Sequence, residues 1–488
     1  MTDVDAVVIG AGPNGLAAAV TLARAGLRVS VYERAATIGG GARTAELTLP
    51  GFLHDVCSAV HPMALASEFF QRFGLADRVD LLLPEVSYGH PLDGGRAGIA
   101  WRDLDRTVDG LGRDGRAWRS LMGPLASHAD QVAQFLGGSL LRVPRHPITA
   151  ARFGLRALEQ GSPAWNLRFT GDEAPGMLSG VGAHSILPMP SLSTAGAALS
   201  LGAYAHGHGW PIPVGGSQAI VDAMAADLLA HGGSIHTGVE VDSLAGLPSH
   251  RAALFDTTPR ALASIVDLPA SYRRRLERFR YGNAAAKVDF ALSGPVPWSN
   301  ADLHRAGTVH VGGTRTAIAN SEREVADGRH PADPYVLVAQ PSVLDAGRAP
   351  AGKHVLWAYT HVPAGSTVDP TEAVTAQLER FAPGFRDLIL GSASTTAAQM
   401  EQYNPNYIGG DIAAGAATFA QLLARPVLAA DPWRTPVRGV YLSSSSASPG
   451  PGVHGLVGWR AAISALRNEF GIRAESIALG ADRVRGAA

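Results

Sequence analysis

Apolar and polar positions along the first 33 residues predict a strand, a helix and a second strand. Ala6–Ile9 is an apolar run of strand length, and the glycine-rich stretch after it marks a turn. The next apolar residues recur at helical spacing: Leu16, Ala19, Val20 and Ala23. Gly26 can end that helix, and Arg28–Tyr32 indicates a second strand. This order of elements is typical of an α/β fold.

The turn between the first strand and the helix has the glycine spacing of a dinucleotide-binding loop. Gly10 allows a sharp turn, Gly12 lets the backbone approach a pyrophosphate, and Gly15 lets the helix pack against the strand. The helix start offers free N–H groups and its positive dipole end. Glu33 ends the second strand, where a carboxylate accepts hydrogen bonds from a ribose diol. The predicted contacts in the turn are Gly10, Gly12, Pro13, Asn14 and Gly15. The alternative is an ordinary glycine turn of an α/β unit.

A second glycine-rich loop follows Glu33 directly and favours FAD over NAD as the predicted cofactor. Gly39–Gly41 lets the backbone lie against a further part of an extended cofactor, and Arg43 supplies a forked donor for phosphate oxygens. The loop resembles the motif of two glycines and an arginine in flavoproteins of the amine oxidase and phytoene desaturase superfamily. FAD is therefore the predicted cofactor, with NAD or a flexible surface loop as alternatives. The residues expected to take part are Arg34, Gly40, Gly41 and Arg43.

A motif near the C-terminal end of the chain also indicates a flavin cofactor. Gly439–Leu442 indicates a short buried strand, and the turn Pro449–Gly455 precedes a helical stretch to about Phe470. In the flavoproteins that the chain resembles, this helix start faces the flavin pyrimidine, where negative charge gathers on reduction. The resemblance thus implies flavin contacts from Ser444, Gly452, Val453 and His454. Without it, the segment is a plain loop and helix cap.

A middle segment also fits the nucleotide fold. Ser217 is placed to cap a helix predicted from about 218 to 230, and a strand begins at Ser234. In the superfamily, this segment gives a backbone contact to the adenine from the residue equivalent to Val239. Because one cofactor must touch both ends of the chain, the FAD-binding part must be discontinuous.

The predicted fold class is α/β. It combines a Rossmann-like FAD-binding domain, of the glutathione reductase and amine oxidase type, with an inserted α+β substrate domain. Alternating runs such as Lys287–Leu292 and Pro334–Ala339 predict sheet strands in the inserted part. The FAD-binding domain is expected over 1–65, 205–261 and 426–475, the substrate domain over 66–204 and 262–425, and a C-terminal tail over 476–488.

Composition excludes several classes of protein. The net charge of −1 comes with no basic block, which argues against a nucleic-acid partner. Cys57 is the only cysteine, so a CxxC redox pair and the disulfide-reductase branch of flavoproteins are excluded. No apolar run reaches the roughly 18 residues of a membrane span, and no signal peptide is evident. We therefore expect a cytoplasmic enzyme.

The stretch from Gln131 to Arg156 is both apolar and basic. One interpretation is peripheral membrane contact that admits a lipid-like substrate. The favoured interpretation is a pair of substrate-domain helices with a solvated charged face.

Taken together, the motifs resemble the phytoene desaturase-related FAD-dependent oxidoreductases, in the subgroup related to pyridine nucleotide-disulfide oxidoreductase domain-containing protein 2. This resemblance implies FAD, a two-domain fold and an apolar substrate tunnel. Two departures stand out: Ser443-Ser444 replaces a frequent Cys-Gly, and Pro451 interrupts a frequent run of glycines. The stretches that carry the resemblance are Gly10–Gly15, Gly39–Arg43, Gly51–Ser58, Lys287–Trp298, Trp357–Pro363, Asn404–Asp411 and Pro449–Gly455.

Four side chains are candidate catalytic residues. His454, in the flavin-end turn, is placed to donate to flavin or substrate; its alternative is a turn residue that satisfies the local backbone. His61 ends a loop that runs beside the flavin in relatives. His361 and Asp411 lie in motifs that line the substrate face or make ordinary loop hydrogen bonds.

Covalent flavin attachment and a metal site are both weighed and set aside. His and Cys are the usual tethers, and His54, Cys57 and His61 lie close together in sequence, but non-covalent FAD is expected. His206 and His208 form half a metal site with no nearby cysteine or carboxylate set, so no metal is predicted.

The predicted activity is an FAD-dependent dehydrogenase, desaturase or oxidase that moves a hydride from a C–H bond of a hydrophobic small molecule to flavin N5. No second nucleotide fold is visible, which favours oxygen or a quinone as the electron acceptor. The alternatives are a flavin-dependent isomerase or mutase without net redox, and an FAD-containing partner-binding protein. Substrate identity and oligomeric state stay open.

Overall fold

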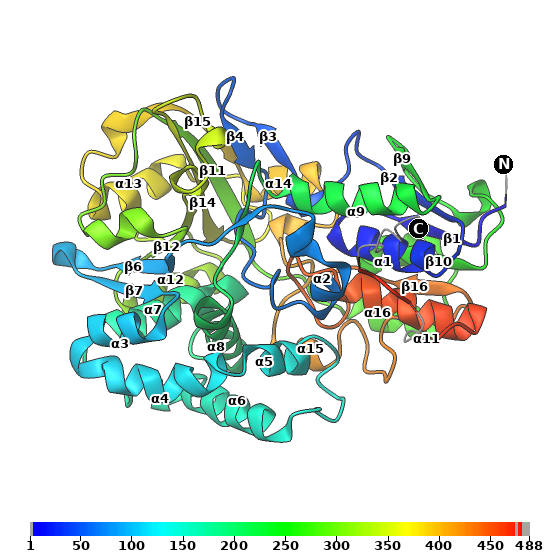
Figure 1. Ribbon diagram of the computed structural model, residues 1–488, viewed down its shortest axis with the longest axis horizontal. Helices are drawn as coiled ribbons and strands as arrows, with labels where there is room; N and C mark the ends of the chain where they lie inside the picture. Colours follow the sequence, from blue (N-terminus) through cyan, green and yellow to red (C-terminus); the bar gives the residue numbers. More distant parts are fainter. Residues whose placement is uncertain (1–2, 474–476, 481–488) are drawn as a thin grey trace, which may run out of the picture.

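Two sheets organise the chain, and the computed structural model describes residues 3–473 and 477–480. The first sheet has five parallel strands in the order β16-β10-β1-β2-β9 (Figure 1). These strands come from the beginning, middle and end of the chain: β1 (Ala6–Ile9), β2 (Val29–Glu33), β9 (Ser234–Thr237), β10 (Ala252–Phe255) and β16 (Val440–Leu442). Val8 of β1 pairs with Leu254 on one side and Val31 on the other. A parallel sheet of apolar strands needs cover on its faces.

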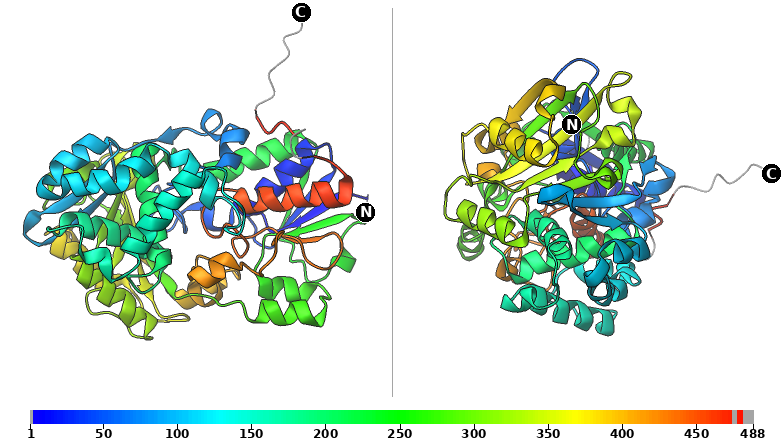
Figure 2. Two further views of the ribbon diagram at one scale, coloured as in Figure 1. Left: turned by 90° about the horizontal axis from the view of Figure 1, so that it is seen from below. Right: turned by 90° about the vertical axis from the view of Figure 1, so that its left-hand side faces the viewer.

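Three helices form one layer against this sheet. They are α1 (Pro13–Arg24), α9 (Gln218–Ala230) and α16 (Leu456–Ala465), and α1 lies between the other two (Figure 1). Figure 2 (left) shows α1 in blue beside α16 in red. The further helices that pack near the first sheet are α2 (Glu68–Phe73), α10 (Pro259–Ile265) and α11 (Ala270–Glu277). The layer therefore joins segments that are far apart in sequence.

The contact between α1 and α16 leaves no room for a side chain. A Cβ placed on Gly458 of α16 would lie 1.7 Å from the carbonyl oxygen of Asn14 in α1. Gly455, with a φ of +65°, begins α16 in a left-handed conformation that favours glycine. The backbones of the first and last helices of this layer are thus in direct contact.

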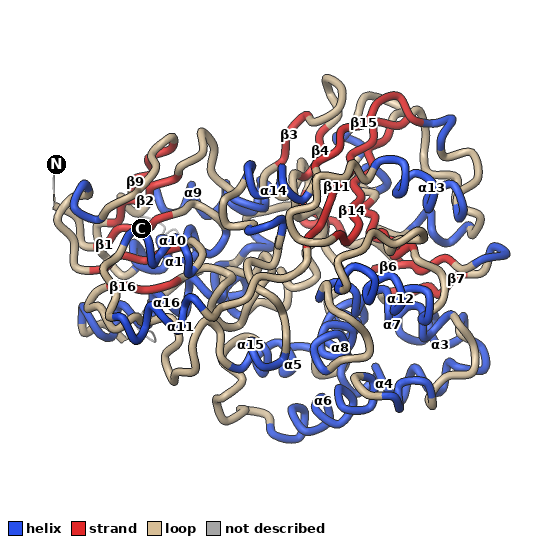
Figure 3. Tube along the Cα trace, turned by 180° about the vertical axis from the view of Figure 1, so that it is seen from behind, coloured by secondary structure: helices blue, strands red, loops and turns tan. Residues whose placement is uncertain are grey.

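The second sheet has seven strands in the order β15-β11-β14-β13-β12-β6-β7. It is antiparallel apart from the β12–β6 pair. Its strands are β6 (Val86–Pro91), β7 (Ala97–Trp101), β11 (Ala284–Leu292), β12 (Thr308–Val311), β13 (Val336–Ala339), β14 (His354–Val362) and β15 (Ile389–Thr395). Two short pairs accompany it: β3 (Thr44–Glu46) with β4 (Leu53–Asp55), and β5 (Leu81–Leu82) with β8 (Ile212–Pro213). Seen from behind, the strands form two groups at opposite ends of the molecule (Figure 3).

Helices surround the second sheet. A group of α4, α5, α6 and α8 packs together below it, and α7 connects that group to the sheet (Figure 1). The helices of this part of the molecule are α3 (Leu104–Gly110), α4 (Gly115–Ala126), α5 (Ala129–Leu136), α6 (Pro147–Gln160), α7 (Glu173–Gly182), α8 (Leu192–Gly207), α12 (Arg315–Ala326), α13 (Thr371–Phe381), α14 (Ala397–Tyr403) and α15 (Phe419–Leu423).

Buried ion pairs tie β4 to the second sheet. Arg348 donates to Asp55 Oδ2 at 2.7 Å and to the Leu53 carbonyl at 3.1 Å. Lys287 of β11 pairs with Asp289, which faces His54 at 3.4 Å. Such buried charges are tolerated because each has a partner at hand. They hold the β3–β4 hairpin, and the loop that follows it, against the inserted part.

The predicted α/β fold class is confirmed. Helix α9 has the predicted bounds, but the capping role expected of Ser217 is wrong, because its side chain makes no bond to the helix start. The Ser217 hydroxyl donates to the Ser58 carbonyl at 2.5 Å and contacts His61 Nε2 at 2.8 Å. The domain boundaries stay a prediction, and most of the expected tail at 476–488 lies outside the described residues.

Gly458→Ala tests the contact between α1 and α16. A methyl group at this position must push the two backbones apart, so we expect the free energy of unfolding to fall by about 1–3 kcal/mol. Gly196→Ala, in α8, is the matched control because, apart from its chain neighbours and the nearby backbone of its own helix, no atom of the described residues lies within 4 Å of its Cβ position. Removing that helical glycine should raise stability by up to about 1 kcal/mol. Denaturant unfolding of the two variants measures the difference, and equal effects would contradict the close contact.

Candidate functional site

One cavity of about 1130 Å³ connects the two parts of the molecule. It is lined by the β1–α1 turn, the loop before β3, the turn before α16, and residues of α5, α6 and α8. Every residue expected to contact the cofactor lines it except Gly15. These are Gly10, Gly12, Pro13, Asn14, Glu33, Arg34, Gly40, Gly41, Arg43, Val239, Ser444, Gly452, Val453 and His454. Segments from both ends of the chain therefore share one space.

The two glycine loops at the dinucleotide end touch each other. A Cβ on Gly40, whose φ is +54°, would lie 3.1 Å from Gly12 Cα. Glu33 accepts hydrogen bonds from the Ala11 amide at 2.9 Å and the Ala35 amide at 2.8 Å. These bonds fix the carboxylate at the end of β2, and both of its oxygens retain lone pairs for a ribose diol. The geometry fits a dinucleotide lying along bare backbone.

Arg43 holds the second glycine loop together. Its guanidinium donates to the Ile38 carbonyl at 3.1 Å, to the Thr37 carbonyl at 2.6 Å and to Tyr403 Oη at 3.0 Å. It also lies 3.5 Å from Glu33. Most of its five donors are thus taken by the protein, so its first effect on a cofactor is to shape the loop.

Arg34 and Val239 lie at the outer part of the dinucleotide end. Arg34 is half exposed and faces Glu240 at 3.6 Å. The Val239 amide donates to the Glu33 carbonyl at 2.9 Å, which continues the pairing of β2 with β9. The backbone of this segment is thereby aligned beside Glu33, where an adenosine would lie.

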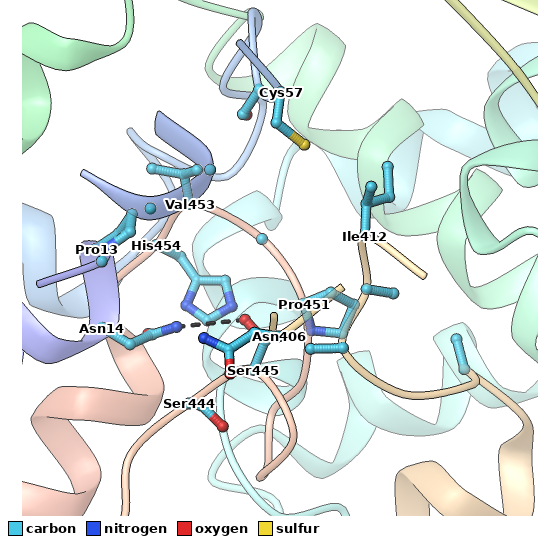
Figure 4. A pocket seen from close by; sticks show the side chains of 18 of the residues that line it. Pro13, Asn14, Cys57, Asn406, Ile412, Ser444, Ser445, Pro451, Val453 and His454 are labelled. Atoms are coloured by element: carbon cyan, nitrogen blue, oxygen red, sulfur yellow. Dashed lines mark hydrogen bonds between the residues drawn. The ribbon is translucent and has the colours of Figure 1, made fainter. Parts of the chain in front are cut away.

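At the flavin end, two distant segments are bonded to each other across the cavity wall. Asn14 Nδ2 of α1 donates to Ser445 Oγ at 3.4 Å, drawn as the dashed line in Figure 4. His454 and Pro451 face the same space. The segment that leads into α16 therefore lies beside the start of α1.

His454 is fully buried, and its two ring nitrogens differ. Nδ1 accepts the Leu456 amide at 3.0 Å, so the proton of the neutral ring sits on Nε2. Burial lowers the pKa of His454 to about 4, against the opposing effect of the Gly450 and Pro451 carbonyls. Nε2 has no hydrogen-bond partner among the described residues. His454 thus secures the start of α16, and its buried Nε2 is influenced by the Gly450 and Pro451 carbonyls.

The other three catalytic candidates differ in position. His61 lines the cavity and its Nε2 is bonded to Ser217 Oγ, while burial lowers its pKa to about 4. His361 does not line the cavity; its Nδ1 lies 2.6 Å from Glu322 Oε1. Asp411 does not line it either. The site thus includes His454 and His61, and leaves His361 and Asp411 behind its wall.

Asp411 organises a loop that does line the cavity. Its carboxylate accepts the amides of Gly282 at 2.7 Å, Gly415 at 2.8 Å and Ala413 at 2.9 Å. Burial raises its pKa, opposed by these bonds and by Arg425. Loop amides thus use the hydrogen-bonding capacity of the carboxylate. Ala413 and Ala414, and not Asp411, line the cavity.

Asp256 and His184 are polar groups of the cavity that sequence reasoning missed. Asp256, directly after β10, lies against the dinucleotide turn. His184 lines the cavity in the inserted part, and its Nε2 lies 2.9 Å from Nε2 of His310. Burial lowers the pKa of His184 to about 3. Neither residue belongs to a short motif, and His184 and His310 are 126 positions apart, so no local signal could have found them.

Aromatic side chains and one thiol complete the wall near the predicted flavin end. Trp357 and Tyr359 of β14 meet edge to face with ring centroids 5.2 Å apart, and Tyr407 lies opposite Gly41. Cys57 is buried here, and burial raises the pKa of its thiol. A neutral thiol fits a cofactor held without a covalent bond.

In the ranges 3–473 and 477–480, no helix is long and apolar enough to cross a membrane. Within those same ranges, no group of three or more His, Cys, Asp or Glu side chains could hold a metal ion.

Comparison with known proteins gives a family match over most of the chain. A sequence profile of the family described as flavin containing amine oxidoreductase matches residues 14–462. Rat pyridine nucleotide-disulfide oxidoreductase domain-containing protein 2 is 27% identical over 95% of this chain and 93% of its own length. A polypeptide of the limonene dehydrogenase from Castellaniella defragrans is 34% identical over 22% of this chain and 20% of its own length.

A solved structure shows the same fold. Cyclohexylamine oxidase from Brevibacterium oxydans superposes with a TM-score of 0.57 at 19% identity, covering 98% of this chain and 99% of its own. The family is defined by flavin, and the contacting glycine loops and the bare helix start fit that cofactor. The cofactor is therefore FAD, and the resemblance to this superfamily and to the rat relative's subgroup is confirmed.

Arg43→Ala should weaken FAD binding by loosening the loop of Gly39–Ala42. Loss of several charge-assisted hydrogen bonds, about 1.5–3 kcal/mol each before compensation, predicts at least about a tenfold rise in the FAD dissociation constant. Arg386→Ala is the matched control, because its ion pair with Glu372 is exposed and neither residue lines the cavity, so FAD binding should not change. FAD content after gel filtration and fluorescence titration measure both, and full FAD content in Arg43→Ala would contradict this role.

Proposed function

The chain belongs to the flavin-containing amine oxidoreductase family, and from this premise we propose which reaction and which substrate class it serves. It is an FAD-dependent oxidoreductase. Our proposal is a dehydrogenase, desaturase or oxidase that takes a hydride from a C–H bond of a hydrophobic small molecule. Bound FAD would supply the hydride acceptor, flavin N5. The observation that carries the proposal is the single cavity in which the dinucleotide end meets an apolar arm.

The apolar arm lies between α5, α6 and α8. Its polar groups are few, chiefly the hydroxyls of Ser193 and Ser200, and Ser200 donates to the Gly196 carbonyl at 2.8 Å. Such a lining favours an apolar substrate, because a polar one would lose its hydration without new hydrogen bonds. The partial match to a limonene dehydrogenase, an enzyme named for a hydrocarbon, is consistent with this class. The side chains of the arm include Phe135, Leu136, Phe153, Ala157, Leu158, Ala197 and Leu201.

The inserted part places an uncharged hydrogen-bonding group on the cavity wall. His184 and His310 meet nitrogen to nitrogen, so only one of the two atoms can carry a proton between them. Their burial, and the nearby His90, keep the pair neutral. The His184 ring, uncharged on the cavity wall, can exchange a hydrogen bond with a substrate hydroxyl or amine, while its low pKa disfavours full protonation.

Two other functions stay as alternatives, and oxygen or a quinone is the proposed electron acceptor. A flavin-dependent isomerase or mutase would use the same cavity but need reduced flavin that is not consumed. An FAD-containing partner-binding protein would tolerate loss of the cavity polar groups. The neutral His184–His310 pair facing the arm favours an enzyme over the second alternative.

An anaerobic screen of apolar alcohols, amines, terpenes and fatty acyl compounds tests the proposed reaction. A substrate should bleach the visible flavin absorbance of the purified protein without oxygen. Readmitted air should restore the colour if oxygen is the acceptor. A compound that turns over only after prior flavin reduction, with no net bleaching, would support the isomerase instead.

We also propose that α6 brings the apolar arm to an anionic membrane surface. Ile148, Leu155 and Leu158 form an outward stripe at helical spacing and are 69%, 67% and 57% exposed. Leu158 also lines the cavity, so the stripe borders the arm. Residues 137–158 contain four arginines and no acidic residue: Arg142, Arg145, Arg152 and Arg156. Arg156 is paired with Glu159 at 2.9 Å, so the other three supply most of the positive charge. This pairing of apolar stripe and positive charge fits a bilayer interface.

The double variant Ile148→Glu/Leu155→Glu tests this contact. The wild-type protein should sediment with vesicles of phosphatidylglycerol and phosphatidylcholine, and the variant should not, because charge replaces the apolar stripe. Leu390→Glu, an exposed leucine of β15, is the control and should sediment like the wild type. Failure of the wild-type protein to bind these vesicles would exclude the membrane contact.

A further inference from the structure

Asp256 lies directly against the part of the dinucleotide turn that the FAD pyrophosphate must approach. It follows the last residue of β10, and its own amide donates to the Ile9 carbonyl at 2.7 Å. Its Oδ2 accepts the Gly15 amide at 2.8 Å. A Cβ on Gly12 would lie 2.7 Å from the same oxygen. The carboxyl group therefore occupies one of the N–H donors at the start of α1.

The charged surroundings of Asp256 do not offset its charge. Glu33 of β2 is a charged group that acts on Asp256, and it has the same sign. Asn406 approaches only its backbone, at 3.4 Å from the Asp256 carbonyl. Arg43 is engaged by Glu33 and by loop carbonyls. Across residues 3–473 and 477–480, no Lys, Arg or His side chain forms an ion pair with Asp256.

Burial raises the pKa of Asp256 to about 7. The Gly15 and Gly12 amides oppose this rise, and Glu33 adds to it. The protein without cofactor can therefore hold this carboxyl group in either form near neutral pH. The charge of a group that binds at the turn then decides whether Asp256 is protonated or ionised.

That charge is the pyrophosphate, with two negative charges. A helix start offers only about half a positive charge. An ionised Asp256 and a pyrophosphate bound at this turn would share it, and their like charges would repel. We propose that Asp256 is protonated whenever FAD is bound, so that uptake of the cofactor is coupled to uptake of one proton at this carboxyl group. The inference depends on FAD alone and not on the proposed substrate.

The coupling fixes the direction of the pH dependence. Well below its pKa of about 7, Asp256 is already protonated in the cofactor-free protein, so the dissociation constant of FAD should change little with pH. Above pH 7 the proton must first be gained from solvent, and the constant should rise by up to about tenfold per pH unit. FAD itself gains or loses no phosphate proton in this range.

Dilution of the holoenzyme into buffers from pH 6 to pH 9 tests the proposal, with released FAD followed by its fluorescence. The wild-type protein should hold FAD equally at pH 6 and 6.5 and lose it progressively above pH 7. Asp256→Asn keeps an acceptor for the Gly15 amide but cannot ionise, so its FAD affinity should be flat and exceed that of the wild type at pH 9. Glu240→Gln is the control: it removes an acid that is 69% exposed at the same end of the cavity and should keep the wild-type slope.

A second measurement does not depend on the variant folding. Calorimetric titration of FAD into the deflavinated wild-type chain at pH 8, in buffers of different ionisation enthalpy, should show close to one proton taken up. A flat wild-type affinity from pH 6 to 9, or no proton uptake at pH 8, would overturn the proposal. An unchanged slope in Asp256→Asn would assign the proton to another group and overturn it equally.

Discussion

The backbone contact between α1 and α16 is the constraint on which the site depends. Gly458 allows the two helices to approach until a carbonyl of one meets the Cα of the other. This distance sets the Asn14–Ser445 bond and places the turn before α16 beside the dinucleotide turn. A cofactor that needs both helix starts can be bound only while this contact holds. The glycine is thus a packing residue whose effect appears at the cavity.

Polar groups inside the molecule divide into those that build the cavity and those that face it. The Asp411 carboxylate accepts hydrogen bonds from three loop amides, and the Arg43 guanidinium donates to loop carbonyls. Saturated groups of this kind give shape but have little capacity left for chemistry. Asp256, His184 and His454 lie at the cavity, and each retains hydrogen-bonding capacity or a protonation state that can change. That difference, and not residue type, separates scaffold from candidate machinery.

The sequence predicted the fold well because its signals are local. Glycine spacing, apolar runs and a helix from about 218 to 230 depend on neighbouring residues, and α9 has those bounds. The role of Ser217 was wrong because its partners, Ser58 and His61, come from a loop more than 150 positions away. Asp256 and His184 carried no motif, and their importance arises only when distant strands bring them to one cavity. Long-range contacts were therefore the part that sequence patterns could not supply.

The order in which the strands enter the first sheet has a consequence during synthesis. Ser445 follows Asn14 by 431 positions, and β16 adds to the sheet beside β10. While the ribosome is still making the inserted part, the nascent chain has the adenosine end of its site but lacks the flavin end. It can meet the cofactor only partially at that stage, and firm loading must await the final helices.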